Sequence, residues 1–205
     1  MSSPRHQAVH RRESQPAGFD FTLHMRALCD DMVRRLPELS HIDLARVAIG
    51  FCQTRKSVSH GVYASLTPMR FAGGRSETIR RGRRWGLQRL YDPAGVEMLY
   101  ILSFYLPRFL DLDFRRKLTT VLHELWHISP RFDGDVRRHH GRFWAHGASQ
   151  KLYDVQVELL AERWWSLDPP PAVYEFLQNS FRSLVGRYGS VYGRKFPTPK
   201  LLLLE

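Results

Sequence analysis

The chain has 205 residues, 43% of which are hydrophobic, and a formal net charge of +11. This length is enough for one domain with its own core, and the longest apolar run, residues 98–106, is too short to span a bilayer. The two cysteines, Cys29 and Cys52, exclude a disulfide framework. We expect free thiols, with a single bridge as the other possibility, in a soluble cytoplasmic protein without a signal peptide.

The N-terminal part of the chain divides into a polar segment and the start of a folded domain. Residues 1–18 are basic and poor in apolar side chains, and we expect them to be disordered. A folded domain is predicted over residues 19–185. Its first helix is predicted over residues 21–36, where apolar side chains recur at helical spacing and Pro37 follows.

Short apolar segments in the first half of the chain predict a sheet. We expect strands at residues 44–53, 62–71 and 98–105, and a further strand at residues 85–91. Because proline cannot donate to a central ladder, Pro68 indicates that the second of these is an edge strand or contains a bulge.

The C-terminal half is predicted to be mainly helical. Apolar positions at helical spacing predict a helix over residues 111–128, and a loop rich in Pro, Gly and Asp follows at residues 129–136. We expect two more helices, at residues 142–165 and 172–185. Residues 186–205 are predicted to be an irregular tail, whose terminal leucines could dock as an edge strand or cover the core.

The helix predicted over residues 111–128 carries the sequence HELWH, which is an HExxH motif at His123–His127. Residues four apart lie on one face of a helix, so His123 and His127 can bind the same metal ion. Glu124 lies beside the first histidine and can reach a water molecule on that metal. This is the arrangement of residues in a zinc peptidase.

A catalytic zinc site usually has three protein ligands and leaves one position for water. The loop at residues 129–136 lets the chain turn back and bring a third ligand to the metal. We favour His140, which precedes Gly141 and two aromatic residues at the predicted start of the next helix. The alternatives that stay open are His139, His146, Glu158 and Glu162.

The HELWH sequence, followed after a loop by His140–Trp144 (HGRFW), resembles the SprT/Spartan-type zincins, in which an HGxxF/W element follows HExxH. The segment from residue 118 to residue 144 also resembles a set of small metallopeptidases of prokaryotes and phages. The resemblance implies an α+β fold: a small zincin-like domain with a mostly antiparallel sheet, packed against the HExxH helix, and a helical C-terminal half. An edge strand above the metal would let an extended peptide add to the sheet, but the sequence does not identify that strand.

The same resemblance implies one zinc ion (Zn2+) and hydrolysis of protein or peptide substrates. Carried over by position, it makes His123, His127 and His140 the zinc ligands and Glu124 the general base. Two departures from the SprT-type pattern stand out. The four-cysteine zinc ribbon of many SprT-type proteins has no counterpart here, and His139 beside His140 makes the third ligand ambiguous.

With zinc bound, Glu124 is expected to accept a proton from the metal-bound water and to pass it to the leaving amine. A second electrophile would stabilise the developing oxyanion. Tyr153, Arg138 and Arg142 are candidates for that role, although Tyr153 is explained more simply as a packing aromatic residue.

Arginine carries most of the positive charge, and it is clustered. One run comprises Arg80, Arg81, Arg83 and Arg84, and a second group, Arg137, Arg138 and Arg142, flanks the predicted third ligand. Such a basic surface attracts DNA, RNA or acidic proteins. The sequence therefore predicts a zinc metallopeptidase that could act on DNA-associated proteins. The alternatives are a non-catalytic nucleic-acid-binding protein with a structural metal site and a metal hydrolase that acts on non-peptide bonds.

Overall fold

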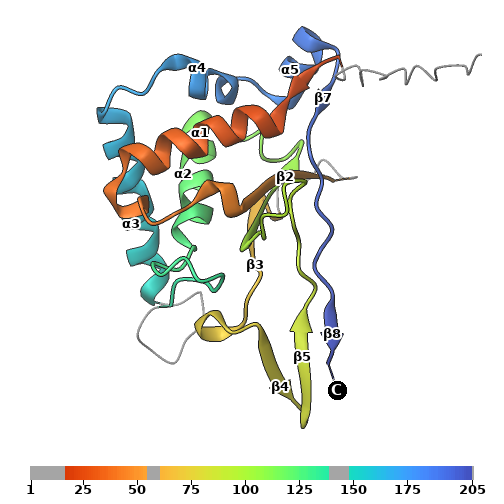
Figure 1. Ribbon diagram of the computed structural model, residues 1–205. Helices are drawn as coiled ribbons and strands as arrows, with labels where there is room; N and C mark the ends of the chain where they lie inside the picture. Colours follow the sequence, from red (N-terminus) through yellow and green to blue (C-terminus); the bar gives the residue numbers. More distant parts are fainter. Residues whose placement is uncertain (1–16, 55–60, 139–147, 205) are drawn as a thin grey trace, which may run out of the picture.

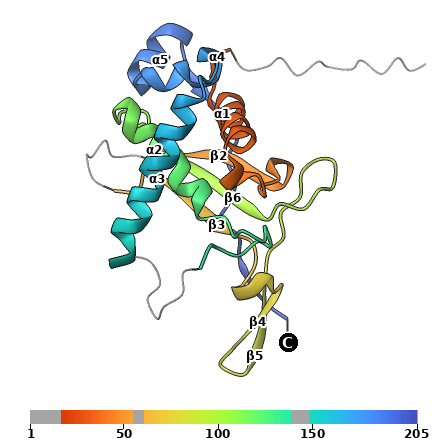
Figure 2. The ribbon, with the colours of Figure 1, turned by 90° about the vertical axis from the view of Figure 1, so that its left-hand side faces the viewer.

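The computed structural model of the chain describes residues 17–54, 61–138 and 148–204. In these ranges, helices pack against a small central sheet, and a second sheet projects from it (Figures 1 and 2). The pairings between the described strands are mostly antiparallel, and the predicted α+β class is confirmed. No helix in the described ranges is long and apolar enough to cross a membrane.

The central sheet has three strands in the order β2-β6-β3. β2 (Val47–Gln53) pairs with β6 (Tyr100–Leu106) in parallel, and β3 (Ala64–Pro68) pairs with β6 in the antiparallel direction. β6 lies in the middle, and its nearly continuous apolar sequence reflects burial on both faces. β3 lies at one edge, in agreement with the position of Pro68.

Two helices pack against this sheet, and a third packs along one of them. α1 (Phe21–Arg35) contacts β2, α2 (Phe114–Trp126) contacts β3, and α3 (Ala148–Ser166) packs along α2 (Figure 2). The sequence predicts α1 and α2, and an aspartate caps the N-terminus of each. The carboxylates of Asp20 and Asp113 accept hydrogen bonds from backbone N–H groups in the first turns of α1 and α2.

A buried polar contact joins the first helix to the last turn of the third. The indole N–H of Trp164 in α3 donates to the carboxylate of Asp31 in α1 over 2.9 Å. Arg35 donates to the same carboxylate over 2.8 Å. Because Trp164 is fully buried and Asp31 is 6% exposed, these bonds replace the water that the two groups lose on folding.

The helix predicted over residues 172–185 is not continuous. The structure has a short helix α4 (Pro171–Tyr174), a 3₁₀ turn at Glu175–Gln178, and a separate helix α5 (Phe181–Tyr188). Ser180 caps α5 through its hydroxyl group, which accepts a hydrogen bond from the N–H of Ser183. The prediction of one helix is therefore wrong.

Lys117 of α2 gives the physical reason for the break. Its side chain is 2% exposed, and its ammonium group donates to the carbonyl groups of Leu177 (2.8 Å) and Asn179 (2.9 Å). A continuous helix would use these carbonyls for its own hydrogen bonds. Burial lowers the pKa of Lys117 to about 8, and the two carbonyls provide hydrogen-bond acceptors for the buried amine.

The second sheet has the order β4-β5-β8. β4 (Glu77–Arg80) and β5 (Arg83–Leu87) form a hairpin, and β8 (Leu201–Leu203) pairs with β5 (Figure 1). The terminal leucines thus dock as an edge strand, which was one of the two predicted outcomes. β4 was not predicted, and β5 begins before the predicted strand at residues 85–91, because the arginines obscure the apolar alternation.

The two ends of the described chain also meet. β1 (Phe19–Asp20) pairs in parallel with β7 (Val191–Tyr192). The predicted irregular tail therefore contains two short strands, while its separation from a domain at residues 19–185 stays a prediction. Residues 1–16 of the predicted disordered segment lie outside the described residues. Both cysteines are free, as expected.

The Asp31–Trp164 contact gives a test of what joins α1 to α3. Asp31→Ala should lower the free energy of unfolding by about 2 kcal/mol, because it leaves a buried indole N–H without an acceptor. The neighbouring Asp30→Ala is the matched control. Among the described residues, the side chain of Asp30 forms an exposed ion pair with Arg34, so its removal should change the free energy of unfolding by about 0.5 kcal/mol or less. Urea denaturation measures both, and equal effects would refute this role of Asp31.

Candidate metal centre

The two histidines of the HExxH motif converge on the same side of α2. Their Nε2 atoms lie 3.1 Å apart, and the two imidazole rings meet edge to face at an interplanar angle of 82°. Two nitrogen ligands of a tetrahedral zinc ion, each about 2.0–2.1 Å from the metal, lie about 3.3 Å apart. The separation between His123 and His127 therefore fits two ligands of one zinc ion with a small adjustment of the rings.

Tyr153 of α3 supports this histidine pair. Its hydroxyl group donates to the backbone carbonyl of His123 over 2.8 Å. The centroid of its ring lies 4.7 Å from that of His123 and 5.0 Å from that of His127. Tyr153 is half-buried and packs against the core. The structure thus places this predicted packing residue against both histidines, which restricts the directions in which the rings can turn.

The side chain of Glu124 points towards β3. Its side chain is almost fully buried, and the backbone N–H of Leu66 in β3 hydrogen-bonds to its carboxylate. Burial raises the pKa of Glu124 to about 7, and the hydrogen bond from Leu66 opposes this effect. A carboxyl group with a pKa near neutrality can both accept and return a proton. A divalent cation bound beside it would lower this pKa again.

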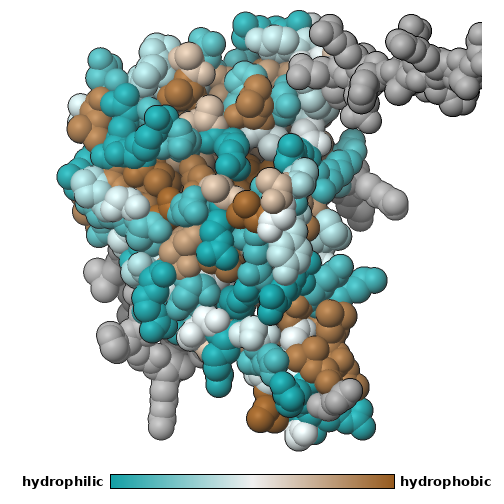
Figure 3. Space-filling model, in the orientation of Figure 1, coloured by the Kyte–Doolittle hydropathy of each residue, from teal (hydrophilic) through white to brown (hydrophobic). Residues whose placement is uncertain are grey.

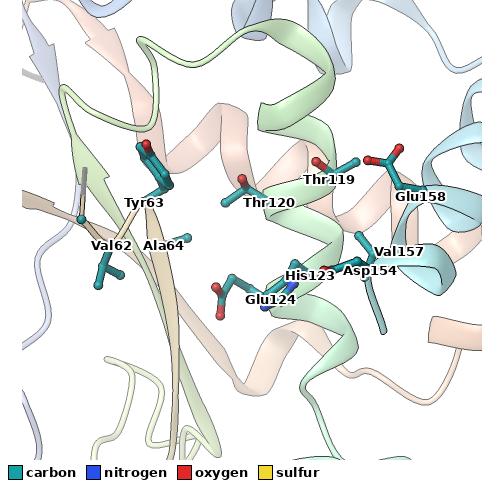
Figure 4. A pocket seen from close by; sticks show the side chains of 11 residues that line it. Val62, Tyr63, Ala64, Thr119, Thr120, His123, Glu124, Asp154, Val157 and Glu158 are labelled. Atoms are coloured by element: carbon teal, nitrogen blue, oxygen red, sulfur yellow. The ribbon is translucent and has the colours of Figure 1, made fainter. Parts of the chain in front are cut away.

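A cleft of about 490 Å³ opens where these groups meet. One wall is the chain leading into β3, and the other walls are α2 and α3 (Figure 4). Figure 4 shows the carboxyl group of Glu124 directed towards the strand, with His123 next to it on the helix. The residues that line the cleft include Val62, Tyr63, Ala64, Thr119, Thr120, His123, Glu124, Asp154, Val157 and Glu158.

The predicted third ligand cannot be placed. His140 and the alternatives His139 and His146 lie outside the described residues, and so does Arg142. Within residues 17–54, 61–138 and 148–204, no group of three or more His, Cys, Asp or Glu side chains is arranged to hold a metal ion. The identity of the third ligand therefore stays a prediction.

The two glutamates that were considered as ligands form ion pairs instead. Arg115 of α2 donates to Glu158 over 2.8 Å and to Glu162 over 3.0 Å, and both glutamates belong to α3. All three side chains are largely exposed. These contacts join α2 to α3 on the side of the cleft that lies away from β3 (Figure 4).

The loop after α2 returns to the end of that helix. Ile128 pairs with Val136 in an isolated bridge, and the backbone N–H of Arg137 donates to the carbonyl of His127 over 2.7 Å. The guanidinium group of Arg137 stacks 3.7 Å above the ring of Trp126 and donates to its carbonyl. At residue 137 the chain is therefore again beside the second histidine of the motif.

Asp135 holds this loop in place, a role that was not predicted. It is 4% exposed and accepts hydrogen bonds from the N–H of Gly73 (2.8 Å) and from Nε and Nη2 of Arg138. Burial alone would raise the pKa of Asp135, but these donors and Val136 hold it below its ordinary value. Arg138, a candidate electrophile, is thus engaged in an ion pair with the loop.

The histidine pair, the buried glutamate and most of the residues that line the cleft lie within the part of the chain that resembles a known family. A family model described as "Putative phage metallopeptidase" matches residues 23–154. No curated protein and no solved structure matches the chain. The matched family is one of phage metallopeptidases, so the closer likeness to SprT/Spartan-type zincins remains a prediction.

Members of a metallopeptidase family use a metal cofactor and act on protein or peptide substrates. The match begins in α1, includes the whole central sheet and the HExxH helix, and ends in α3 at the far wall of the cleft. It covers more than half of the sequence. The chain therefore belongs to this phage metallopeptidase family.

Proposed function

We propose that this protein is a zinc-dependent endopeptidase that hydrolyses peptide bonds with Glu124 as its general base. The observation that carries the proposal is the arrangement on α2: two histidine Nε2 atoms 3.1 Å apart and, next to them, a buried carboxyl group facing a cleft. In this proposal His123 and His127 are two of the zinc ligands, and His140 is the third. The nitrogen-rich ligand set favours zinc over magnesium or calcium.

The chemistry that a bound zinc ion would supply is polarisation of the scissile carbonyl and a lowered pKa of the attacking water. Glu124 accepts the proton of this water, because its carboxyl group lies on the cleft side of the helix. It then returns the proton to the amine that leaves. Tyr153 holds His123 and His127 through its hydroxyl group and its ring, so the histidine nitrogens stay directed towards one point.

The edge strand β3 supports a peptide as the substrate. Among the described residues it pairs with β6 alone, and its first residue, Ala64, lines the cleft together with Glu124. An extended peptide can add to such an edge through main-chain hydrogen bonds, with its scissile bond beside α2. We infer that β3 is the strand above the metal that the sequence did not identify.

The described end of the loop supports His140 as the third ligand. The backbone of Arg137 already hydrogen-bonds to His127, and His140 follows three residues later in the sequence. The two glutamate alternatives have a competing partner in Arg115. That the substrates are proteins associated with DNA is the more specific part of the proposal, and it is supported by the net charge of +11.

The general-base role can be tested by Glu124→Gln. This variant should retain about one zinc ion per chain, because the ligands are unchanged, and should lose at least 100-fold in the rate of cleavage, roughly the range for general base catalysis. Elemental analysis and cleavage of an unfolded protein measure the two quantities. Glu162→Gln is the control with the same chemical change on an exposed side chain. Full activity of Glu124→Gln, or no cleavage by the unaltered protein, would disprove the proposed mechanism.

The third ligand can be tested by comparing three histidine variants. His140→Ala should reduce bound zinc well below one ion per chain, whereas His139→Ala and His146→Ala should keep it close to one. Each protein is purified without added metal and measured by elemental analysis, with circular dichroism to show that it is folded. Loss of zinc in His139→Ala or His146→Ala, with retention in His140→Ala, would reassign the ligand.

Tyr153→Phe tests whether the tyrosine positions the histidines. This change keeps the ring and removes only the hydroxyl group that donates to His123. We expect the zinc dissociation constant to rise about tenfold, as for other groups that orient metal ligands. Competition with a chromogenic chelator measures it. Tyr188→Phe, at a tyrosine that is 45% exposed on α5, should have no effect. Equal zinc affinity in all three proteins would leave Tyr153 with a packing role alone.

A further inference from the structure

The β4–β5 hairpin ends in a projecting tip that the catalytic site does not use. Figures 1 and 2 show this hairpin extending away from the helices, with its turn at the outermost point. The turn is formed by Arg81 and Gly82, which both have positive φ angles, 52° and 74°. Every residue from Arg80 to Arg84 is exposed. We call these five residues the basic tip.

In the basic tip, positively charged side chains face each other and are not all paired with carboxylates. Arg80 and Arg83 are register partners across the hairpin, so their side chains lie on the same face. Arg84 pairs with Glu77 through two hydrogen bonds. Across the described residues, Arg80, Arg81 and Arg83 have no carboxylate partner. Like charges that face each other across two strands destabilise the pair, and a bound anion would remove this repulsion.

The turn itself has an unusual residue at its first position. Positive φ at both central residues is typical of the type I′ turn, which strongly prefers Asn-Gly or Asp-Gly. Here an arginine occupies the position where asparagine is better suited, and a left-handed conformation is unfavourable for a residue with a long side chain. Local strain of this kind is often retained at positions with a function. The hairpin thus carries a guanidinium group at its end despite a conformational cost.

We propose that the basic tip binds the phosphate backbone of duplex DNA. Guanidinium groups form paired hydrogen bonds with phosphate oxygens, and three of them point outward from one hairpin. A two-stranded ribbon fits the major groove of B-form DNA, whereas the major groove of duplex RNA is too deep and narrow for side chains to enter. The contact is to the backbone, so it is independent of base sequence.

An anionic membrane is the other surface that a basic hairpin could contact. The exposed leucines of β8 lie beside β5, and Figure 3 shows this apolar patch towards the lower end of the molecule. Insertion into a membrane requires apolar side chains at the part that enters first. Here the arginines are at the tip and the leucines lie behind them, against β5. Because the arginines, and not the leucines, lie at the projecting end, the hairpin is better suited to contact DNA than to insert into a membrane.

The base of the hairpin is attached to the metal-site loop. The N–H of Gly73, just before β4, donates to Asp135, and the N–H of Arg70 donates to the carbonyl of Gly134. A duplex on the basic tip would therefore be held in a fixed relation to the cleft. Proteins on that duplex would be brought close to the cleft, which adds to the proposed function, although DNA binding itself does not depend on catalysis.

The test is fluorescence anisotropy with a labelled duplex DNA of arbitrary sequence, measured at several salt concentrations with the full chain. The double variant Arg80→Ser/Arg83→Ser should bind at least about tenfold more weakly at low salt. The slope of log K against log salt concentration should become shallower by about 2, since two phosphate contacts are lost. Arg182→Ser/Arg187→Ser on α5, at the far end of the molecule, is the control with the same change in charge. It should change the affinity less than threefold.

A second variant separates binding from folding. Arg81→Asn places the preferred residue in the turn, so the melting temperature should be unchanged or higher while DNA affinity falls. Glu124→Gln should bind DNA as the unaltered protein does, and Arg80→Ser/Arg83→Ser should still cleave an unfolded protein. The proposal is overturned if the unaltered protein does not bind duplex DNA, or if both double variants lose affinity equally. Tighter binding to vesicles of anionic lipid than to DNA would also overturn it.

Discussion

Two neighbouring residues of one helix must face two different partners, and the arrangement of the fold follows from this constraint. His123 and Glu124 are consecutive, and successive side chains on an α-helix point about 100° apart. α2 therefore needs a support on each side. α3 supplies Tyr153 to the histidine side, and the edge strand β3 supplies a backbone N–H and an open edge to the glutamate side. The cleft lies where these three elements meet.

The same constraint has an energetic consequence for Glu124. Its pKa in the folded chain is about 7, above the value for an exposed glutamate, because the carboxyl group is buried. Because the pKa is higher in the folded chain than in the unfolded chain, folding favours the protonated form of Glu124. This contribution to the free energy of unfolding is fully present below the unfolded pKa of ~4.3 and is lost as the pH rises through about 7. At neutral pH the metal-free fold therefore carries a partly ionised, buried carboxyl group. A cation bound at the histidine pair, as proposed, would offset that cost and so couple metal binding to the stability of α2.

Local signals predicted α1 and α2, because each has apolar residues at helical spacing and a proline soon after its end. The four-residue spacing also predicted that His123 and His127 share one helix face, with Glu124 beside the first of them. Local signals failed where a distant side chain decides the backbone: Lys117 interrupts the predicted helix at residues 172–185 by binding two of its carbonyls. They missed β4 because three of its four residues, Glu77, Thr78 and Arg80, are polar. They could not select β3, since the partner of an edge strand is set by contacts far apart in sequence. Asp135 looked like an ordinary loop residue, although its burial fixes the loop after the motif.

The loop that contains Asp135 also connects the β4–β5 hairpin, which carries the basic tip, to the helix that lines the cleft. One carboxylate receives hydrogen bonds from Gly73, at the base of the hairpin, and from Arg138, at the end of the loop that leaves the HExxH helix. A displacement of the hairpin base would break the bond from Gly73 and leave a nearly fully buried carboxylate short of one donor, which is energetically unfavourable. The hairpin and the HExxH helix are therefore held in a fixed position relative to each other. The hydrogen bond from the N–H of Arg70 to the carbonyl of Gly134 makes a second connection between the same two segments, so the position of the basic tip relative to the cleft does not depend on Asp135 alone.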